Sequence, residues 1–227
     1  MFRIYLLRHG QTELNEKELV QGWNDSELTN LGLFQAKCTG FGLKDTQFHK
    51  VYSGDSGRQI ATAEAFLSQN TNSIPQIIKD PHFREKSYGK FEYYTYLDMV
   101  RPLLLRHNEA LIYDNLFKHY DDLQIAYEVS VLDDSGKSET PDMVWDRFSK
   151  GLDMIVSENS DGNILISTSS VAIAIVIDHL FPEFKDNGIV DNASITVISY
   201  QDGKYYLDDF NNTSYRKIGE QHIQKDF

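Results

Sequence analysis

The stretch FRIYLLRHGQTELN, residues 2–15, contains a short apolar run followed at once by an arginine, a histidine and a glycine. Its first part, residues 2–7, is apolar and rich in β-forming side chains, which predicts a buried strand. A buried strand that ends in Arg8, His9 and Gly10 places a cation and an imidazole at its carboxyl end. Ligands bind at that end of the strands in open α/β sheets. The stretch therefore predicts a ligand site; the alternative is a surface loop that happens to contain Arg8 and His9.

A second segment repeats this arrangement. Residues 51–53 are typical of a strand, and Asp55 or Ser56 can cap a helix over residues 57–67. Arg58 lies in the first turn of that helix, where the macrodipole favours anions over cations. Either an anion lies between Arg58 and the helix end, or Arg58 is exposed and pairs with Asp55. Two strand-end arginines and a histidine favour a pocket for an oxyanion, most simply a phosphoryl group.

The rest of the chain alternates between strand-like and helix-like segments. Thr29 can cap a helix that continues to about residue 38. The apolar segment 164–168 predicts another buried strand, which leads into an apolar helix over residues 171–180. Strands that alternate with helices in this way imply a layered α/β fold with a mostly parallel central sheet.

The last third of the chain departs from this alternation. Residues 194–200 and 204–207 flank Asp202-Gly203, a tight-turn pair that predicts an antiparallel hairpin. Residues 93–139 show no strand-like alternation and predict a helical insertion, after which Pro141 can begin another helix. No repeat or linker divides the chain, so we expect a single domain over residues 1–227.

Composition limits the function classes. The chain has 22 Lys and Arg against 34 Asp and Glu, which gives a net charge of −12. Such a charge repels nucleic acids and anionic membranes, so neither is an expected partner. A single cysteine, Cys38, excludes an internal disulfide framework and fits a reducing compartment. No run near the first residue is long enough for a signal peptide or membrane span, so we expect a cytoplasmic protein.

Five groups of residues, spread in order from residue 2 to about residue 215, resemble the motifs of one known family. They are Arg8-His9-Gly10-Gln11-Thr12 with Asn15; Gln21-Gly22 with Asp25; Ser53-Gly54-Asp55-Ser56-Gly57-Arg58 with Thr62; the segment 83–92; and Asn192-Ala193-Ser194 with Asn212-Thr213. The family is the histidine phosphatase superfamily, in its phosphoglycerate mutase-like branch. The resemblance implies a three-layer α/β sandwich of the phosphoglycerate mutase type.

The resemblance also implies a covalent mechanism. His9 would attack the phosphorus of a small phosphomonoester and hold the phosphoryl group as phosphohistidine. Arg8 and Arg58 would bind the phosphoryl oxygens and neutralise their charge in the transition state. Glu85 would protonate the leaving oxygen, which requires a raised pKa. Burial of Glu85 must therefore outweigh the two cations beside it in the sequence.

The same resemblance assigns further substrate contacts. Asn15, Gln21 and Gly22 would lie near the substrate or its phosphate. The mechanism needs no metal ion and no cofactor, and the sequence shows no Cys/His spacing typical of a metal site. The residues indicate no partner protein and no oligomeric state.

One position departs from the family. Aligned on the strand over residues 164–168, Ser169 and Ser170 stand where the family has a histidine and a glycine. Ser169 keeps a hydrogen-bond donor for the phosphate but lacks the cation of the histidine. Removal of a comparable oxyanion donor lowers the rate by about 10²–10³. Three explanations for this serine remain open: an enzyme with weakened activity, an enzyme in which another group replaces the histidine, and an engineered substitution.

These observations leave three functions open, and a structural domain whose motif residues are relics is a further alternative. A metal-independent phosphatase that acts through His9 is the leading hypothesis, with activity impaired at Ser169. A phosphate-binding pseudoenzyme is the second, because Arg8, His9 and Arg58 can hold a phosphorylated ligand without turnover. A phosphoglycerate mutase is the third, although it requires more cationic contacts than the motifs supply. The aromatic cluster over residues 93–96 either lines the substrate site or packs in the core.

Overall fold

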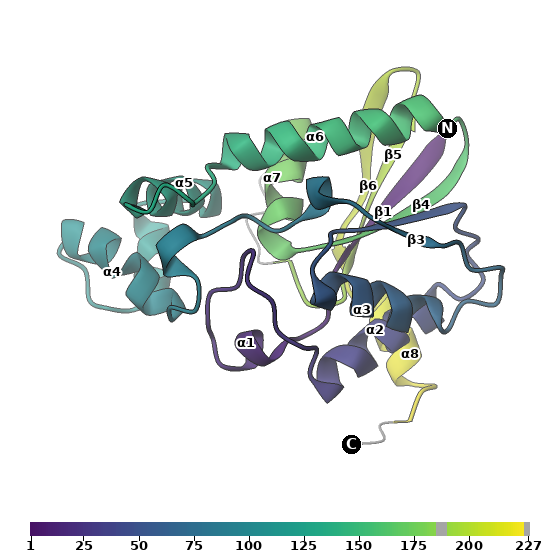
Figure 1. Ribbon diagram of the computed structural model, residues 1–227, viewed down its shortest axis with the longest axis horizontal. Helices are drawn as coiled ribbons and strands as arrows, with labels where there is room; N and C mark the ends of the chain where they lie inside the picture. Colours follow the sequence, from purple (N-terminus) through teal and green to yellow (C-terminus); the bar gives the residue numbers. More distant parts are fainter. Residues whose placement is uncertain (185–189, 225–227) are drawn as a thin grey trace.

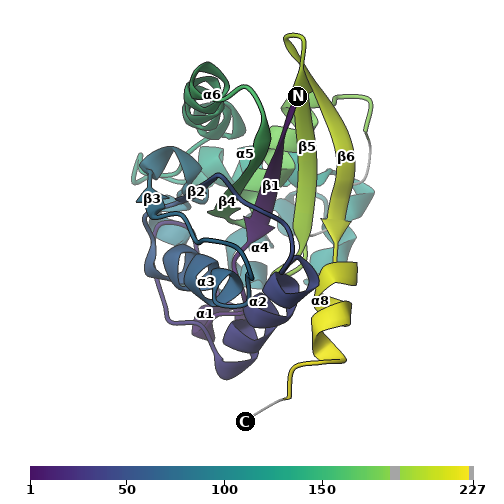
Figure 2. The same ribbon diagram turned by 90° about the vertical axis from the view of Figure 1, so that its right-hand side faces the viewer.

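The computed structural model describes residues 1–184 and 190–224. Its strands form a six-stranded sheet in the order β3-β2-β4-β1-β5-β6. The strands are β1 (Phe2–Arg8), β2 (Lys50–Ser53), β3 (Ile77–Lys79), β4 (Gly162–Thr168), β5 (Ile195–Gln201) and β6 (Lys204–Asn212). Strands β1 to β4 are mutually parallel, and β5 runs antiparallel to both β1 and β6. The mostly parallel sheet with a C-terminal hairpin confirms the predicted α/β class (Figure 2).

Helices follow the strands along the chain. The α-helices are α1 (Glu13–Glu16), α2 (Asn30–Gly42), α3 (Gly57–Leu67), α4 (Tyr96–Arg106), α5 (Asp122–Leu132), α6 (Pro141–Glu158), α7 (Ser170–Leu180) and α8 (Ser214–Glu220). The 3₁₀ turns are η1 (Pro81–Phe83), η2 (Gly89–Phe91) and η3 (Tyr113–Lys118). As predicted, Thr29 caps α2 and Pro141 lies in the first turn of α6. Thr140 caps α6.

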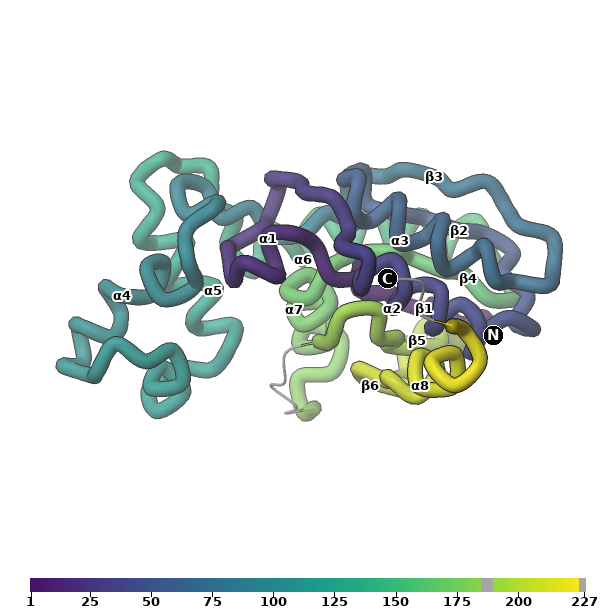
Figure 3. Tube along the Cα trace, turned by 90° about the horizontal axis from the view of Figure 1, so that it is seen from below, coloured from purple at the N-terminus to yellow at the C-terminus, as the bar shows by residue number. Residues whose placement is uncertain are grey.

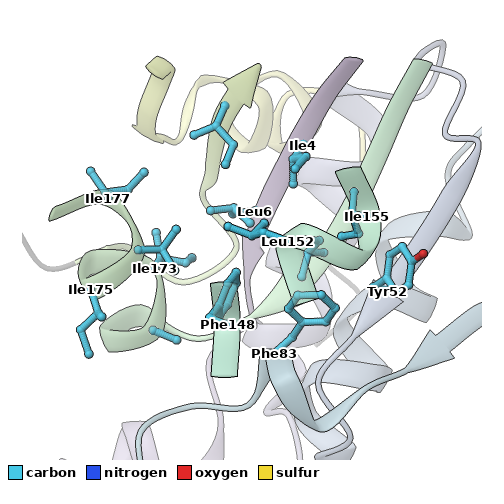
Figure 4. Close-up of a cluster of buried hydrophobic side chains, with 14 of the residues drawn as sticks. Ile4, Leu6, Tyr52, Phe83, Phe148, Leu152, Ile155, Ile173, Ile175 and Ile177 are labelled. Carbon is cyan, nitrogen blue, oxygen red and sulfur yellow. The ribbon is translucent and has the colours of Figure 1, made fainter. Parts of the chain in front are cut away.

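The sheet buries both of its faces, which is why β1 is apolar along its whole length. Successive side chains of a strand point to opposite faces. Ile4 and Leu6 therefore pack with residues of α6 and α7, whereas Tyr5 and Leu7 pack with residues of α3 and the segments that flank it. Figure 4 shows the first of these clusters, with Phe148 and Leu152 of α6 against the sheet. Helices α2, α3 and α8 lie on the other face, which completes the three layers (Figures 1 and 2).

Helices α4 and α5 form the predicted insertion and lie to one side of the sheet, away from residue 1 (Figures 1 and 3). They have a small apolar cluster of their own, which includes Val100, Leu103 and Val129. Tyr88 and Phe91, from the segment before the insertion, belong to the same cluster. The insertion is therefore held to the body of the protein through the segment that contains Glu85.

Strand β3 is absent from the sequence-based expectations. It has three residues at the edge of the sheet, of which Ile78 and Lys79 are exposed, so it lacks the alternating burial that marks a strand. None of the helices in the described part of the chain is long and apolar enough to cross a membrane.

Candidate active site

A cavity of about 550 Å³ lies between the carboxyl end of the sheet and the insertion. The residues predicted as site residues that line it are Arg8, His9, Asn15, Gln21 and Glu85. Gly22 and Arg58 line a smaller polar pocket of about 280 Å³, and Glu85 lines both pockets. Ser169 lines neither of them, whereas its neighbour Ser170 lines the larger cavity.

His9 is held in one ring orientation and one protonation state. Its Nδ1 lies 2.8 Å from the carbonyl oxygen of Gly10. A carbonyl oxygen can only accept a hydrogen bond, so Nδ1 carries the proton and Nε2 keeps its lone pair. Burial and the nearby cations of Arg58 and Arg8 hold the pKa of His9 well below its usual value. His9 is therefore a neutral imidazole near pH 7, which is the nucleophilic form.

The backbone around His9 is fixed from several elements. The His9 N–H donates to the carbonyl oxygen of Thr168 at 3.0 Å, and Asn192 Nδ2 donates to the His9 carbonyl oxygen at 3.0 Å. The Gly10 N–H donates to Thr62 Oγ1 at 3.0 Å, which ties this turn to α3. A Cβ on Gly10 would lie 2.3 Å from the carbonyl oxygen of Gly32. Glycine is thus required at residue 10 because α2 approaches closely, and the turn does not use a positive φ.

Both arginines offer buried N–H groups to an anion. Neither Arg8 Nε nor Arg58 Nε has a hydrogen-bond partner among the described residues, although both atoms are buried. An unpaired buried donor on a charged group costs about 1–3 kcal/mol or more, so each is a feature that a bound anion would relieve. Burial lowers the pKa of both guanidinium groups, but both stay charged because arginine titrates far above neutral pH.

Arg58 pairs with Asp25 and not with Asp55, which was the alternative raised from the sequence. Its Nη1 donates to Asp25 Oδ1 at 3.2 Å and to the Asn24 carbonyl at 2.7 Å, and its Nη2 donates to the Gly22 carbonyl at 2.6 Å. Asp25 also accepts the first N–H groups of α3, including that of Arg58 at 3.3 Å. Asp25 therefore supplies the negative charge at this helix end and orients the arginine. Asp55 forms a two-bond ion pair with Arg84 instead.

Glu85 is 5% exposed, and its carboxyl group lies against the first turn of α7. Its Oε1 accepts the N–H groups of Lys86 and Ala172, and its Oε2 accepts only that of Val171, at 3.1 Å. Burial raises the pKa of the Glu85 carboxyl, while these three N–H groups and the charge of Arg58 lower it; the net direction is upward. Among the described residues no second donor reaches Oε2, so this oxygen can carry the proton that a general acid needs.

Arg147 of α6 holds the Glu85 segment and was not singled out from the sequence. Its guanidinium donates to the carbonyl oxygens of His82, Arg84 and Glu85, at 2.9, 2.8 and 2.8 Å respectively. The same group pairs with the buried carboxylate of Glu139, at 2.8 and 3.0 Å. Arg147 lies on a long helix among other charged residues, so its sequence context resembles an ordinary solvated helix face.

The remaining predicted contacts, Asn15, Gln21 and Gly22, are all hydrogen-bonded within the protein. Gln21 Oε1 accepts from Thr12 Oγ1 at 2.7 Å, and its Nε2 donates to Ser26 at 2.9 Å. Asn15 Oδ1 accepts from Asn192 Nδ2 at 3.3 Å. The Gly22 N–H donates to Glu92 at 2.9 Å, while its carbonyl oxygen binds Arg58. Gly22 thus acts through Arg58 and does not face the larger cavity.

Ser169 is fully buried at the junction of β4 and α7. The strand register pairs Arg8 with Thr168, which brings the Ser169 backbone beside that of His9. Its hydroxyl, however, turns away and accepts a hydrogen bond from Gln59 Nε2 at 2.9 Å. Gln59 is also fully buried and fills the space beside this serine. Ser169 is therefore bonded within the protein, and Ser170 presents the hydroxyl that borders the cavity.

The insertion supplies the far wall of the cavity. Tyr96 of α4, Tyr113 of η3 and Tyr88 before the insertion all line it. Within the aromatic cluster over residues 93–96, Tyr93 and Tyr94 are 53% and 45% exposed, so this cluster is not core packing. Across the described residues, no group of three or more His, Cys, Asp or Glu side chains is placed to hold a metal ion.

Comparisons with known proteins identify the same family that the sequence motifs resemble. The family model for the histidine phosphatase superfamily (branch 1) matches residues 4–213. A solved structure, phosphoglycerate mutase from Bacillus anthracis str. Sterne, superposes with a TM-score of 0.89 and 30% identity over 96% of each chain. This likeness confirms the predicted phosphoglycerate mutase-like fold.

Two curated proteins illustrate the range of activities among the relatives. The metal-independent phosphoserine phosphatase of Arabidopsis thaliana is 25% identical over 213 residues, which cover 93% of this chain and 82% of that protein. The fructose-2,6-bisphosphatase TIGAR B of Danio rerio is 38% identical over 93 residues, which cover 40% of this chain and only 36% of that protein. The relatives include both phosphatases and mutases, and the chain itself belongs to branch 1 of the histidine phosphatase superfamily.

Proposed function

We propose that this protein hydrolyses small phosphomonoesters without a metal ion, through a phosphohistidine at His9. The observation that carries the proposal is the state of the His9 ring. Its Nδ1 proton is committed to the Gly10 carbonyl, so the lone pair on Nε2 is available in a cavity that Arg8 and Glu85 also line. A neutral nucleophile, a cation for the phosphate and an acid for the leaving group then lie around one cavity.

The proposed reaction has two steps. In the first, His9 Nε2 forms a bond to phosphorus as the bond from phosphorus to the ester oxygen breaks, and Glu85 gives its proton to the leaving oxygen. In the second, water attacks the phosphohistidine, Glu85 takes a proton from that water, and inorganic phosphate and free His9 are restored. Arg8 and Arg58 would neutralise charge on the phosphoryl oxygens in both steps.

Turnover should be slower than in a site of this kind that has a histidine in place of Ser169. Ser169 lines neither pocket, and its hydroxyl lies against Gln59, so it does not reach a phosphate in this arrangement. Loss of one oxyanion donor lowers kcat by a factor of about 10²–10³. Ser170 borders the cavity, but its hydroxyl donates to the carbonyl oxygen of Val190 at 3.3 Å and carries no positive charge.

Two other functions compete with this proposal. A phosphate-binding pseudoenzyme needs the arginines but has no use for a carboxyl with a raised pKa, so Glu85 favours the enzyme. A phosphoglycerate mutase must also bind a second anionic group. Arg8 is the lone Lys or Arg among the described residues that line the larger cavity, which favours a phosphatase.

The test is turnover of a simple aryl phosphate in the presence of a metal chelator, with a His9→Ala preparation as the blank. Activity clearly above the blank supports the phosphatase. Activity equal to the blank, together with tight binding of inorganic phosphate to the wild-type protein, would instead support the pseudoenzyme.

A further inference from the structure

The half of the cavity that is distant from His9 differs in character from the phosphate end. It is built by α4, η3 and α5. Figures 1 and 3 show α4 and α5 beside the sheet. Tyr113 and several apolar side chains line it, whereas Tyr88 and Tyr96 lie nearer the phosphate end, close enough to Glu85 and Arg8 to interact with their charges. The apolar side chains are Leu97, Met99, Leu123, Ile125, Ala126 and Val129. This wall suits the apolar body of an ester, and the rings of Tyr88, Tyr96 and Tyr113 also offer faces that attract cations.

The charges around this cavity are mostly negative. Besides Glu85, which carries a proton in the proposed mechanism, its described lining includes the carboxylates of Glu18 and Asp122. Its cation is Arg8, at the phosphate end, and none of the described residues on the distant wall is a lysine or an arginine. A substrate with a second phosphate or a carboxylate would therefore meet like charge there, whereas a positive group would be attracted.

Asp122 is the carboxylate best placed for such a group. It is half-buried in the first turn of α5, and within the described residues it forms no side-chain hydrogen bond or ion pair. Burial raises its pKa, which marks an anion that has lost water without gaining a partner. The nearby Tyr113 hydroxyl responds to it: burial and the charge of Asp122 raise the pKa of Tyr113 to about 12. A cation beside Asp122 would relieve both effects.

We infer that the substrate of the proposed phosphatase is a phosphomonoester whose alcohol carries an apolar or aromatic body that ends in an ammonium group. The inference rests on the proposed function for the phosphate end. The body would lie along the tyrosine wall, and the ammonium group would pair with Asp122 at a tyrosine face. Discrimination against anionic esters then follows from the same carboxylates.

Three aryl phosphates with the same reacting end test this inference. They are 4-(2-aminoethyl)phenyl phosphate, 4-ethylphenyl phosphate and 4-(2-carboxyethyl)phenyl phosphate, which end in a cation, a neutral group and an anion. A half-buried ion pair contributes more to binding than an exposed one, so we expect kcat/KM for the cationic ester to exceed that for the neutral one by about tenfold. The anionic ester should be the poorest substrate. Equal or faster turnover of the anionic ester would overturn the inference.

Two variants locate the effect. Asp122→Asn should lower the ratio of the cationic to the neutral kcat/KM by about tenfold. Asp114→Asn is the matched control: Asp114 is exposed on η3, carries the same charge and does not line the cavity. It should keep the wild-type ratio. An unchanged ratio in Asp122→Asn, with the protein folded, would refute the role of Asp122.

Binding separates this inference from the proposed function. Titration calorimetry of the three esters with His9→Ala measures affinity without turnover. If the wild-type protein hydrolyses none of the esters but His9→Ala still prefers the cationic one, the phosphatase proposal fails and the inference on ligand class stands. If the esters are hydrolysed and neither kcat/KM nor affinity favours the cation, the inference fails and the phosphatase stands.

Discussion

Replacement of Ser169 by histidine tests why the protein lacks the family's second histidine. The Ser169 side chain has no exposed surface, and Gln59 occupies the adjoining space with its Nε2 2.9 Å from the serine hydroxyl. Ser169→His must therefore insert an imidazole into a filled site. Overpacking of this kind costs about 2 kcal/mol, and the lost hydrogen bond costs about 1 kcal/mol more. We expect the free energy of unfolding to fall by about 3 kcal/mol.

A second substitution makes room for the ring. In Gln59→Ala/Ser169→His the imidazole can occupy the volume that the amide leaves. The double variant should be more stable than the sum of the two single effects predicts, by about 2 kcal/mol, because the two residues are in direct contact. It should also regain an oxyanion donor and raise kcat for an aryl phosphate by about tenfold or more over the wild type.

The assay combines urea unfolding, followed by circular dichroism, with steady-state turnover of the same preparations. The double-mutant cycle gives the coupling energy, provided that all four proteins share one m-value. Ser169→His with wild-type stability would refute the idea that Gln59 fills the histidine's space. Strict additivity of the two substitutions would refute it as well.

Three further predictions follow from the buried charges. The pKa of Glu85 is raised and that of His9 is lowered, so kcat/KM should fall as pH rises through the pKa of Glu85. Glu85→Gln should remove that decline and lower kcat by a factor of about 10²–10⁴. A rate that climbs steadily into alkaline pH would contradict this. Burial lowers the pKa of Lys86 from 10.5 to about 8, so the unfolded chain binds more protons between these values and stability should rise with pH across them, by about 3 kcal/mol. Urea unfolding of Lys86→Met should lack that rise, and parallel curves for the two proteins would count against it. Arg147→Lys keeps a positive charge beside Glu139 but loses the guanidinium that holds the backbone carbonyls around Glu85. We therefore expect kcat to fall about tenfold, while the affinity for inorganic phosphate, measured by calorimetry, stays within about twofold. An equal loss in both would assign Arg147 to binding or to stability alone.

The fold is predictable from the sequence where the signal is local. Helix α3 begins and ends at Gly57 and Leu67, as predicted, but its N-cap residue Ser56 forms no side-chain capping bond, and Asp25 accepts the first N–H groups instead. The hairpin of β5 and β6 turns at Asp202-Gly203, where both residues have positive φ. Strand β3 could not be predicted, because three edge residues pair with β2 only once the sheet exists.

The site is predictable to the level of residue type, but its internal partners depend on tertiary structure. Arg58 and Asp25 are 33 residues apart, and nothing local distinguishes Asp25 from Asp55 as the partner. The direction of the Ser169 side chain is equally hidden, because it depends on how an extended residue enters α7. Tyr96 and Tyr113 of the insertion line the cavity. The sequence pattern predicted helices there, but it did not show which face of each helix borders the cavity.

Detection of phosphohistidine at His9 tests the central claim most directly. The wild-type protein is mixed with an aryl phosphate in the presence of a chelator, quenched in alkali within milliseconds to seconds, and digested for mass spectrometry. The mechanism predicts one added phosphoryl group on the peptide that contains His9, present during turnover and absent when substrate is exhausted. His9→Ala should carry none. Turnover by the wild-type protein without any phosphoryl group on His9, or with the group on another residue, would contradict the mechanism.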